Sequence, residues 1–100
     1  MPDPRIWPIP LVRDTFATVG LVSTLVVAAN PDRVDLELVN DSDGVIYLAR
    51  GNAAAIGHGI RLNANGGSYG FGTEKLFLGD INAIGVDGQQ NLTVSEGAKV

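Results

Sequence analysis

The sequence predicts an all-β domain, a single antiparallel β-sandwich or jelly-roll-like barrel with an extended, Pro-rich N-terminal arm. Short segments rich in β-branched and aromatic residues recur at intervals of roughly ten residues, between turns of Gly, Asn and Asp, which is typical of sandwiches and barrels. No gap between these segments holds the helix of about ten residues or more that a parallel βαβ unit requires. We therefore assign residues 1–13 to the arm and residues 14–100 to the sandwich domain.

The composition indicates one folded module. Of the 100 residues, 45% are hydrophobic and 18% are charged, so the chain lies far from the composition of disordered proteins. The absence of cysteine excludes disulfides and thiolate metal sites, and stability must come from packing. The net charge of −4 lacks the positive field that nucleic-acid backbones attract. We expect no nucleic-acid partner.

The chain shows no pattern of export or membrane insertion. Residues 1–10 contain Asp3, Arg5 and four prolines, whereas a signal peptide needs a basic tip followed by an unbroken apolar run. The longest apolar stretch, residues 19–29, is interrupted by polar residues and is too short to cross about 30 Å of hydrocarbon. We expect no membrane partner.

The arm is predicted from its prolines and its apolar residues. Each proline removes an amide donor and biases the preceding residue toward extended geometry, so the arm is neither a helix nor a central strand. Its large apolar side chains are ones that a solvated linker avoids. We predict that the arm docks on an apolar surface, either of its own domain or of a neighbouring chain. The candidate docking residues are Ile6, Trp7, Ile9, Leu11 and Val12.

The clearest strand is Arg33–Leu38, where charged and aliphatic residues alternate. Period-2 alternation places successive side chains on opposite faces. We expect Val34, Leu36 and Leu38 to line the interior, and Arg33, Asp35 and Glu37 to share a solvated outer face. The two carboxylates can in principle act as an acid/base pair, but their charged neighbour Arg33 favours a solvated surface.

Other elements follow from turn chemistry and small residues. We predict a first strand at Leu21–Ala28, a hairpin turn at Asn40–Gly44 leading into Val45–Ala49, and a loop at Arg50–Gly59 with room for no more than a helical turn. The remaining predicted strands are Ile60–Leu62, Ser68–Phe71, Leu76–Leu78, Ile81–Val86 and Leu92–Val94.

Residues for catalysis or metal binding are sparse. The single histidine, His58, lies between two glycines in the predicted loop, where a solvated side chain is the expectation. One histidine without cysteine does not supply the usual zinc or iron ligands. Asp41–Gly44 opens like a calcium loop, but Val45 and Asn52 stand where further oxygen ligands are required. We predict no enzymatic activity, no metal and no cofactor.

Six segments carry a resemblance to a known family. They are Val34–Asn40, Ile46–Ala49, Gly59–Leu62, Gly66–Tyr69, Gly79–Ile84 and Leu92–Glu96. In these strand patterns, the chain from Arg33 to Glu96 resembles small β-sandwich proteins of tailed-bacteriophage virions. Similar sandwiches serve as capsid decoration (cement) proteins, head fibres and tail components.

The resemblance implies a non-enzymatic structural protein on the capsid surface of a virion, present in the host cytoplasm during assembly. Its partners would be the major capsid protein lattice and copies of itself, in a symmetric oligomer such as a trimer. Alternatives within virions are a tail, neck or head-fibre subunit. The alternative from another class is a carbohydrate-binding β-sandwich, in which Trp7, Tyr47, Tyr69 and Phe71 form an exposed stacking platform.

Overall fold

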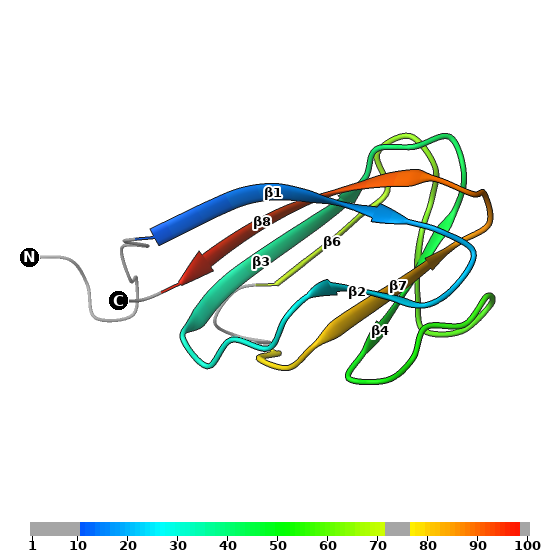
Figure 1. Ribbon diagram of the computed structural model, residues 1–100. Coiled ribbons are helices and arrows are strands. Elements are labelled where there is room, and N and C mark those ends of the chain that lie inside the picture. The colour runs from blue at the N-terminus through cyan, green and yellow to red at the C-terminus, as the bar shows by residue number, and fades with distance from the viewer. Residues whose placement is uncertain (1–10, 72–76, 99–100) are drawn as a thin grey trace, which may run out of the picture.

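The computed structural model describes residues 11–71 and 77–98, which form two four-stranded antiparallel sheets (Figure 1). The strands are β1 (Leu11–Val19), β2 (Thr24–Val27), β3 (Arg33–Asn40), β4 (Ile46–Arg50), β5 (Ile60–Leu62), β6 (Ser68–Phe71), β7 (Ile81–Gly85) and β8 (Gln90–Ala98). The described residues contain no helix. The predicted all-β class and antiparallel sandwich are confirmed.

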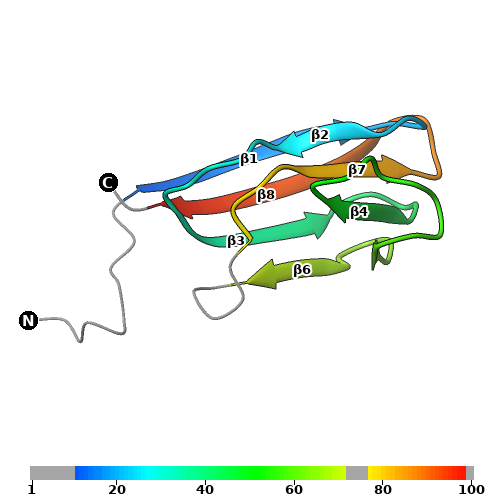
Figure 2. The same ribbon diagram turned by 90° about the horizontal axis from the view of Figure 1, so that it is seen from below.

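The strand order identifies the type of sandwich. Sheet A has the order β1-β8-β3-β6, and sheet B has the order β2-β7-β4-β5. One sheet lies over the other, with strands running roughly along the same direction (Figures 1 and 2). Only β4 and β5 are consecutive strands that pair with each other; every other connection crosses between the sheets. This winding of eight strands is the jelly roll.

The core lies between the inner faces of the two sheets. On β3, Val34, Leu36 and Leu38 are at most 8% exposed, Glu37 is exposed and Asp35 is half-buried, which confirms the predicted faces for these five residues. Side chains from both sheets interdigitate there, as aligned sandwiches require. The buried cluster comprises Val19, Val27, Leu36, Leu38, Ile46, Leu48, Leu62, Ile81, Ala83, Leu92 and Val94.

The predicted hairpin after β3 is wrong, because β3 and β4 belong to different sheets. The turn between them is held by buried amides. Asn40 Nδ2 donates to the carbonyl of Gly44 at 2.7 Å, and Gln90 Nε2 donates to the same oxygen at 2.7 Å. Both amide side chains are at most 1% exposed. A turn sequence predicts a change of direction but not the sheet that the chain enters next; here the two amides bind the turn at which the chain crosses to the other sheet.

The first strand begins ten residues earlier than Leu21, where the sequence predicted it. Residues 11–13, which the sequence assigned to the arm, pair with Glu96–Ala98 as part of β1, whereas residues 21–23 form a turn before β2. As an edge strand with a single neighbour, β1 carries polar residues on both faces and therefore lacks an apolar signal. The remaining arm, with Ile6, Trp7 and Ile9, lies outside the described residues.

The segment after β4 is a loop, as the sequence predicted. The loop predicted at Arg50–Gly59 is confirmed from Gly51 onward and lies against the outer side of sheet B, where Asn82 Nδ2 donates to the carbonyl of Asn52 at 2.7 Å.

The predicted strand Leu76–Leu78 is wrong at Phe77 and Leu78, which have no strand partner. Leu76 lies outside the described residues. The side chain of Phe77 instead packs against the core.

Two glycines of this loop provide a test of how closely it approaches β4. Gly57 and Gly59 have φ of +82° and +81°, but only at Gly59 would a Cβ clash with a backbone atom, the carbonyl oxygen of Leu48. We expect Gly57→Ala to lower the free energy of unfolding by about 1–2 kcal/mol through backbone strain alone. Gly59→Ala should cost about 1–3 kcal/mol more through overpacking. Urea denaturation measures both, and equal losses would contradict the close approach.

Candidate functional site

Of the predicted docking residues, the structure describes Leu11 and Val12, both in β1. The side chain of Val12 is 58% exposed, and that of Phe16, on the same face of the strand, is 67% exposed. Phe16 was not among the docking residues predicted from the sequence. A sequence pattern that could have indicated it is the spacing of Val12, Asp14 and Phe16. In an extended chain these three side chains share one face, with the acidic residue between the two apolar ones.

The outer face of sheet A is hollowed along β8. The outward side chains of β8 are short, and those of its neighbours β1 and β3 are mostly longer. Asp14 and Glu37 lie opposite Ser95 from either side. In the next row, Phe16 and Val39 lie opposite Thr93 from either side. Together with Thr15, Asn91 and Val94, these residues line a shallow groove of about 590 Å³, here called the β8 groove.

The β8 groove has an acidic row followed by an apolar row. The hydroxyl of Ser95 donates to Asp14 Oδ1 at 2.6 Å, which holds this carboxylate at the groove. Asp35 shares the outward face of β3 with Glu37. Within the described part of β1, β8 and β3, the register turns no Arg or Lys toward this face. The groove therefore presents a negative field beside exposed apolar surface.

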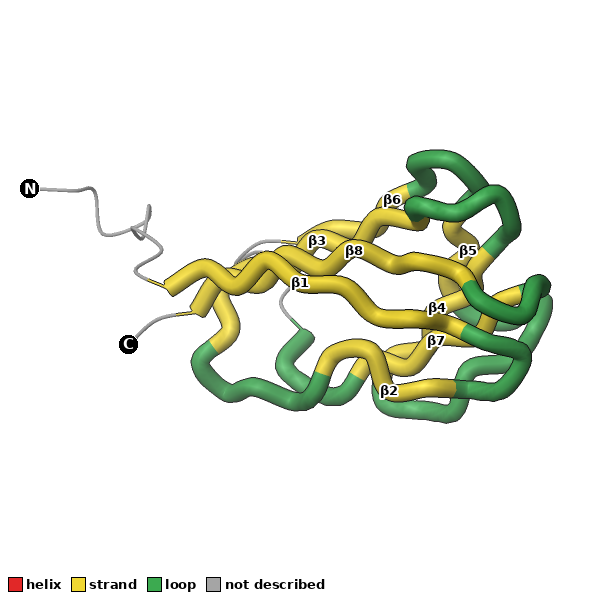
Figure 3. Tube along the Cα trace, turned by 45° about the horizontal axis from the view of Figure 1, so that its top comes forward, coloured by secondary structure: helices red, strands yellow, loops and turns green. Residues whose placement is uncertain are grey.

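A second exposed apolar surface lies at the far end of the sandwich from the start of β1 (Figure 3). There the β1–β2 and β7–β8 turns meet, and the amide of Gly85 donates to the carbonyl of Gly20 at 2.8 Å. These turns carry Leu21, Val22 and Val86, which are 63%, 73% and 44% exposed. We call these three residues the loop patch.

Arg33 is the one predicted surface residue of β3 that the structure buries, at 1% exposure. Its pairing with β8 is irregular between Arg33 and Asp35, and such a bulge breaks the alternation, so that Arg33 and Val34 are both buried. The sequence-based placement of Arg33 on the outer face is therefore wrong.

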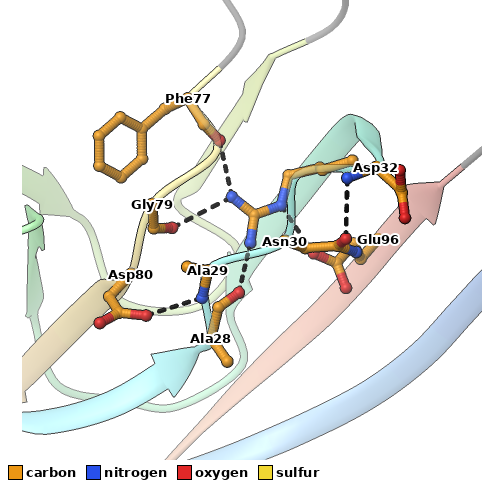
Figure 4. Close-up of polar contacts among 9 residues, drawn as sticks. Ala28, Ala29, Asn30, Asp32, Phe77, Gly79, Asp80 and Glu96 are labelled. Carbon is orange, nitrogen blue, oxygen red and sulfur yellow. Dashed lines mark hydrogen bonds and ion pairs between the residues drawn. The ribbon is translucent and has the colours of Figure 1, made fainter.

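The contacts of Arg33 are structural. Its Nε donates to Glu96 Oε2 at 2.6 Å, its Nη1 donates to the carbonyl of Phe77 at 2.6 Å, and its Nη2 donates to the carbonyl of Ala28 at 2.7 Å. Figure 4 shows Ala28, Phe77, Gly79 and Glu96 gathered around these contacts. The guanidinium thus joins the β2–β3 turn, the segment before β7 and strand β8.

The other sequence candidates do not converge on a site. His58 is exposed in its loop. Within residues 11–71 and 77–98, no group of three or more His, Asp or Glu side chains is placed to hold a metal. Tyr69 and Phe71 pack against the core from sheet A, with ring centroids 5.7 Å apart, whereas Tyr47 lies in sheet B. These three rings of the proposed stacking platform therefore do not share one surface; Trp7 lies outside the described residues.

Comparison of the chain with protein-family models, curated proteins and solved structures finds no match. In the part of the chain that the structure describes, no helix has the length and apolarity to span a membrane. The β8 groove and the loop patch are therefore the surfaces from which a function can be inferred.

Proposed function

We propose that this chain is a non-enzymatic structural protein of a tailed-bacteriophage virion, a capsid decoration protein that binds the assembled head and stabilises it. The strand patterns between Arg33 and Glu96 support this role through their resemblance to virion sandwiches. The jelly-roll strand order supports it as well, because jelly rolls are common in viral capsid domains and in lectins.

The loop patch is the observation that carries the docking role. Single exposed apolar residues are ordinary on protein surfaces, but a contiguous group marks an interaction site. Leu21, Val22 and Val86 are grouped on two turns joined by a backbone hydrogen bond, at one end of a rigid β body. Many copies on one lattice compensate for a small interface in each copy.

The three described rings of the predicted stacking platform favour the virion role over the lectin role. A glycan-binding platform requires exposed rings on one surface. Tyr69 and Phe71 pack inward from sheet A, and Tyr47 belongs to the other sheet. The apolar loop patch, in contrast, suits a protein surface.

Binding to assembled shells tests the proposal. Purified protein is mixed with undecorated mature particles, unexpanded procapsids and free capsid subunits, and binding is followed by sedimentation. We expect saturable binding to mature shells alone, with heat-induced DNA release at a higher temperature, because a ligand that binds only the intact state stabilises it. Binding to tail tubes or to isolated glycans, with shells ignored, would instead support one of the alternatives.

A charge placed in the loop patch should weaken shell binding. Val22→Asp puts a carboxylate on a side chain that is 73% exposed, so folding is retained and the docking contact is lost. We expect the Kd for mature shells to rise about tenfold, equivalent to about 1.4 kcal/mol. The matched control is Leu78→Asp, at the opposite end of the sandwich and 38% exposed, which should leave the Kd within about twofold. Equal Kd values for the two variants would exclude the loop patch as the docking surface.

A further inference from the structure

We propose that copies of this chain join by exchanging their N-terminal arms, with residues 5–7 of one copy bound in the β8 groove of a neighbouring copy. Arg5 would lie between Asp14 and Glu37, and Trp7 between Phe16 and Val39. This association is independent of the virion role and concerns the protein alone.

The spacing of the groove matches an extended segment. Its acidic and apolar rows are two residues apart along β8, a separation of about 6.7 Å. In an extended chain, side chains at positions i and i+2 point the same way and are separated by nearly the same distance. Arg5 and Trp7 have this spacing, and Pro4 and Pro8 on either side favour extended backbone.

The chemistry of each row matches the residue assigned to it. A guanidinium presents donors in a planar fork and bonds carboxylates on more than one side, and the acidic row offers Asp14 and Glu37. The hydrogen bond from Ser95 fixes one of these carboxylates in advance, which lowers the ordering cost of binding. In the next row, an indole ring packs against the 67%-exposed ring of Phe16 in an offset or edge-to-face arrangement.

The direction in which the bound arm must run relative to β1 favours the arm of a neighbouring copy over the arm of the same copy. Asp14 precedes Phe16, so a segment with Arg5 at the acidic row and Trp7 at the apolar row runs parallel to β1. The chain's own arm can reach the groove only by folding back at the start of β1, and it then runs antiparallel to β1. Trp7 would meet the carboxylates, and Arg5 the apolar row. A neighbour's arm is free of this constraint.

Arm exchange also predicts the form of the assembly. Each copy supplies one arm and one groove, and these are different surfaces. Such head-to-tail contacts generate a ring where the rotation closes. Where the rotation does not close, the same contacts generate an open filament, which leaves one groove empty at its end. We expect the ring, because it fills every groove.

Charge reversal in the full-length chain tests the pairing, with sedimentation velocity as the readout. We expect Arg5→Glu and Glu37→Arg each to raise the dissociation constant of the oligomer about tenfold or more, and the double variant to recover most of this loss. The matched control is Arg61→Glu, on the outer face of sheet B, which should leave association unchanged. A wild-type chain that stays monomeric, or an Arg5→Glu variant that associates like wild type, would overturn the proposal.

A photo-crosslinking residue at position 7 decides between arm exchange and docking within one copy. Full-length chains of two isotopic compositions are mixed, irradiated and analysed by mass spectrometry. We expect products that join light and heavy copies through the peptide containing Phe16. Because Trp7 is the single tryptophan, the emission of wild-type protein should also shift to shorter wavelength as association proceeds. Crosslinks confined to single copies would overturn the proposal.

Discussion

Arg33→Met should lower the free energy of unfolding by about 3–5 kcal/mol, the usual cost of removing one partner from a buried ion pair. The substitution removes the 2.6 Å contact to Glu96, whose side chain is only 14% exposed, and leaves the carbonyls of Ala28 and Phe77 without their donor. A domain of this size is stabilised by about 5–15 kcal/mol, so the loss is a large part of the total. Urea denaturation measures it.

The control for this result is Arg61→Met, which removes the same charge from an exposed residue of β5 and should cost about 0.5 kcal/mol or less. A second variant, Arg33→Met with Glu96→Leu, removes both charges. Since it leaves no unpaired carboxylate in this partly buried position, its loss should be smaller than the sum of the losses of Arg33→Met and Glu96→Leu made singly. Equal effects of Arg33→Met and Arg61→Met would show that the buried contacts of Arg33 contribute nothing to stability.

Leu36→Asp should unfold most of the protein at room temperature. Leu36 is 2% exposed and belongs to the core cluster, so the variant buries an unpaired carboxylate. Together with the lost apolar contacts, this costs several kcal/mol. Circular dichroism and thermal melting measure the outcome.

The comparison variant is Ser68→Asp, which introduces the same carboxylate at an exposed position of β6 in the same sheet. We expect a change of about 0.5 kcal/mol or less. Similar melting temperatures for the two variants would mean that the faces of sheet A are assigned wrongly by one residue.

Local patterns predicted most strands but not their partners. The alternation in Arg33–Leu38 predicted β3 and its buried face, and β5 and β6 have the predicted bounds. The same alternation is equally compatible with any neighbouring strand. It therefore did not reveal that the chain crosses to the other sheet after Asn40. The turn at this crossing is bound by the buried amides of Asn40 and Gln90, which are far apart along the chain.

The candidate surfaces, like the strand partners, could be predicted only in part from the sequence. Apolar residues in the first twelve positions predicted docking by the arm, and this remains a prediction for residues 1–10. The β8 groove could not be predicted, because its walls come from β1 and β3, which are separated along the chain and both pair with β8. The loop patch likewise depends on two turns that meet only in the folded protein.

The all-β class, the positions of most strands and the inward face of β3 could be predicted from the sequence alone. These properties depend on neighbours within a few residues, where turn residues and period 2 act directly. The jelly-roll order, the edge position of β1 and the burial of Arg33 become evident only in the folded protein. The partners that satisfy Arg33 lie 5 to 63 residues away along the chain. Contacts of that kind have no local signature, because they are selected by the packing of the two sheets as a whole.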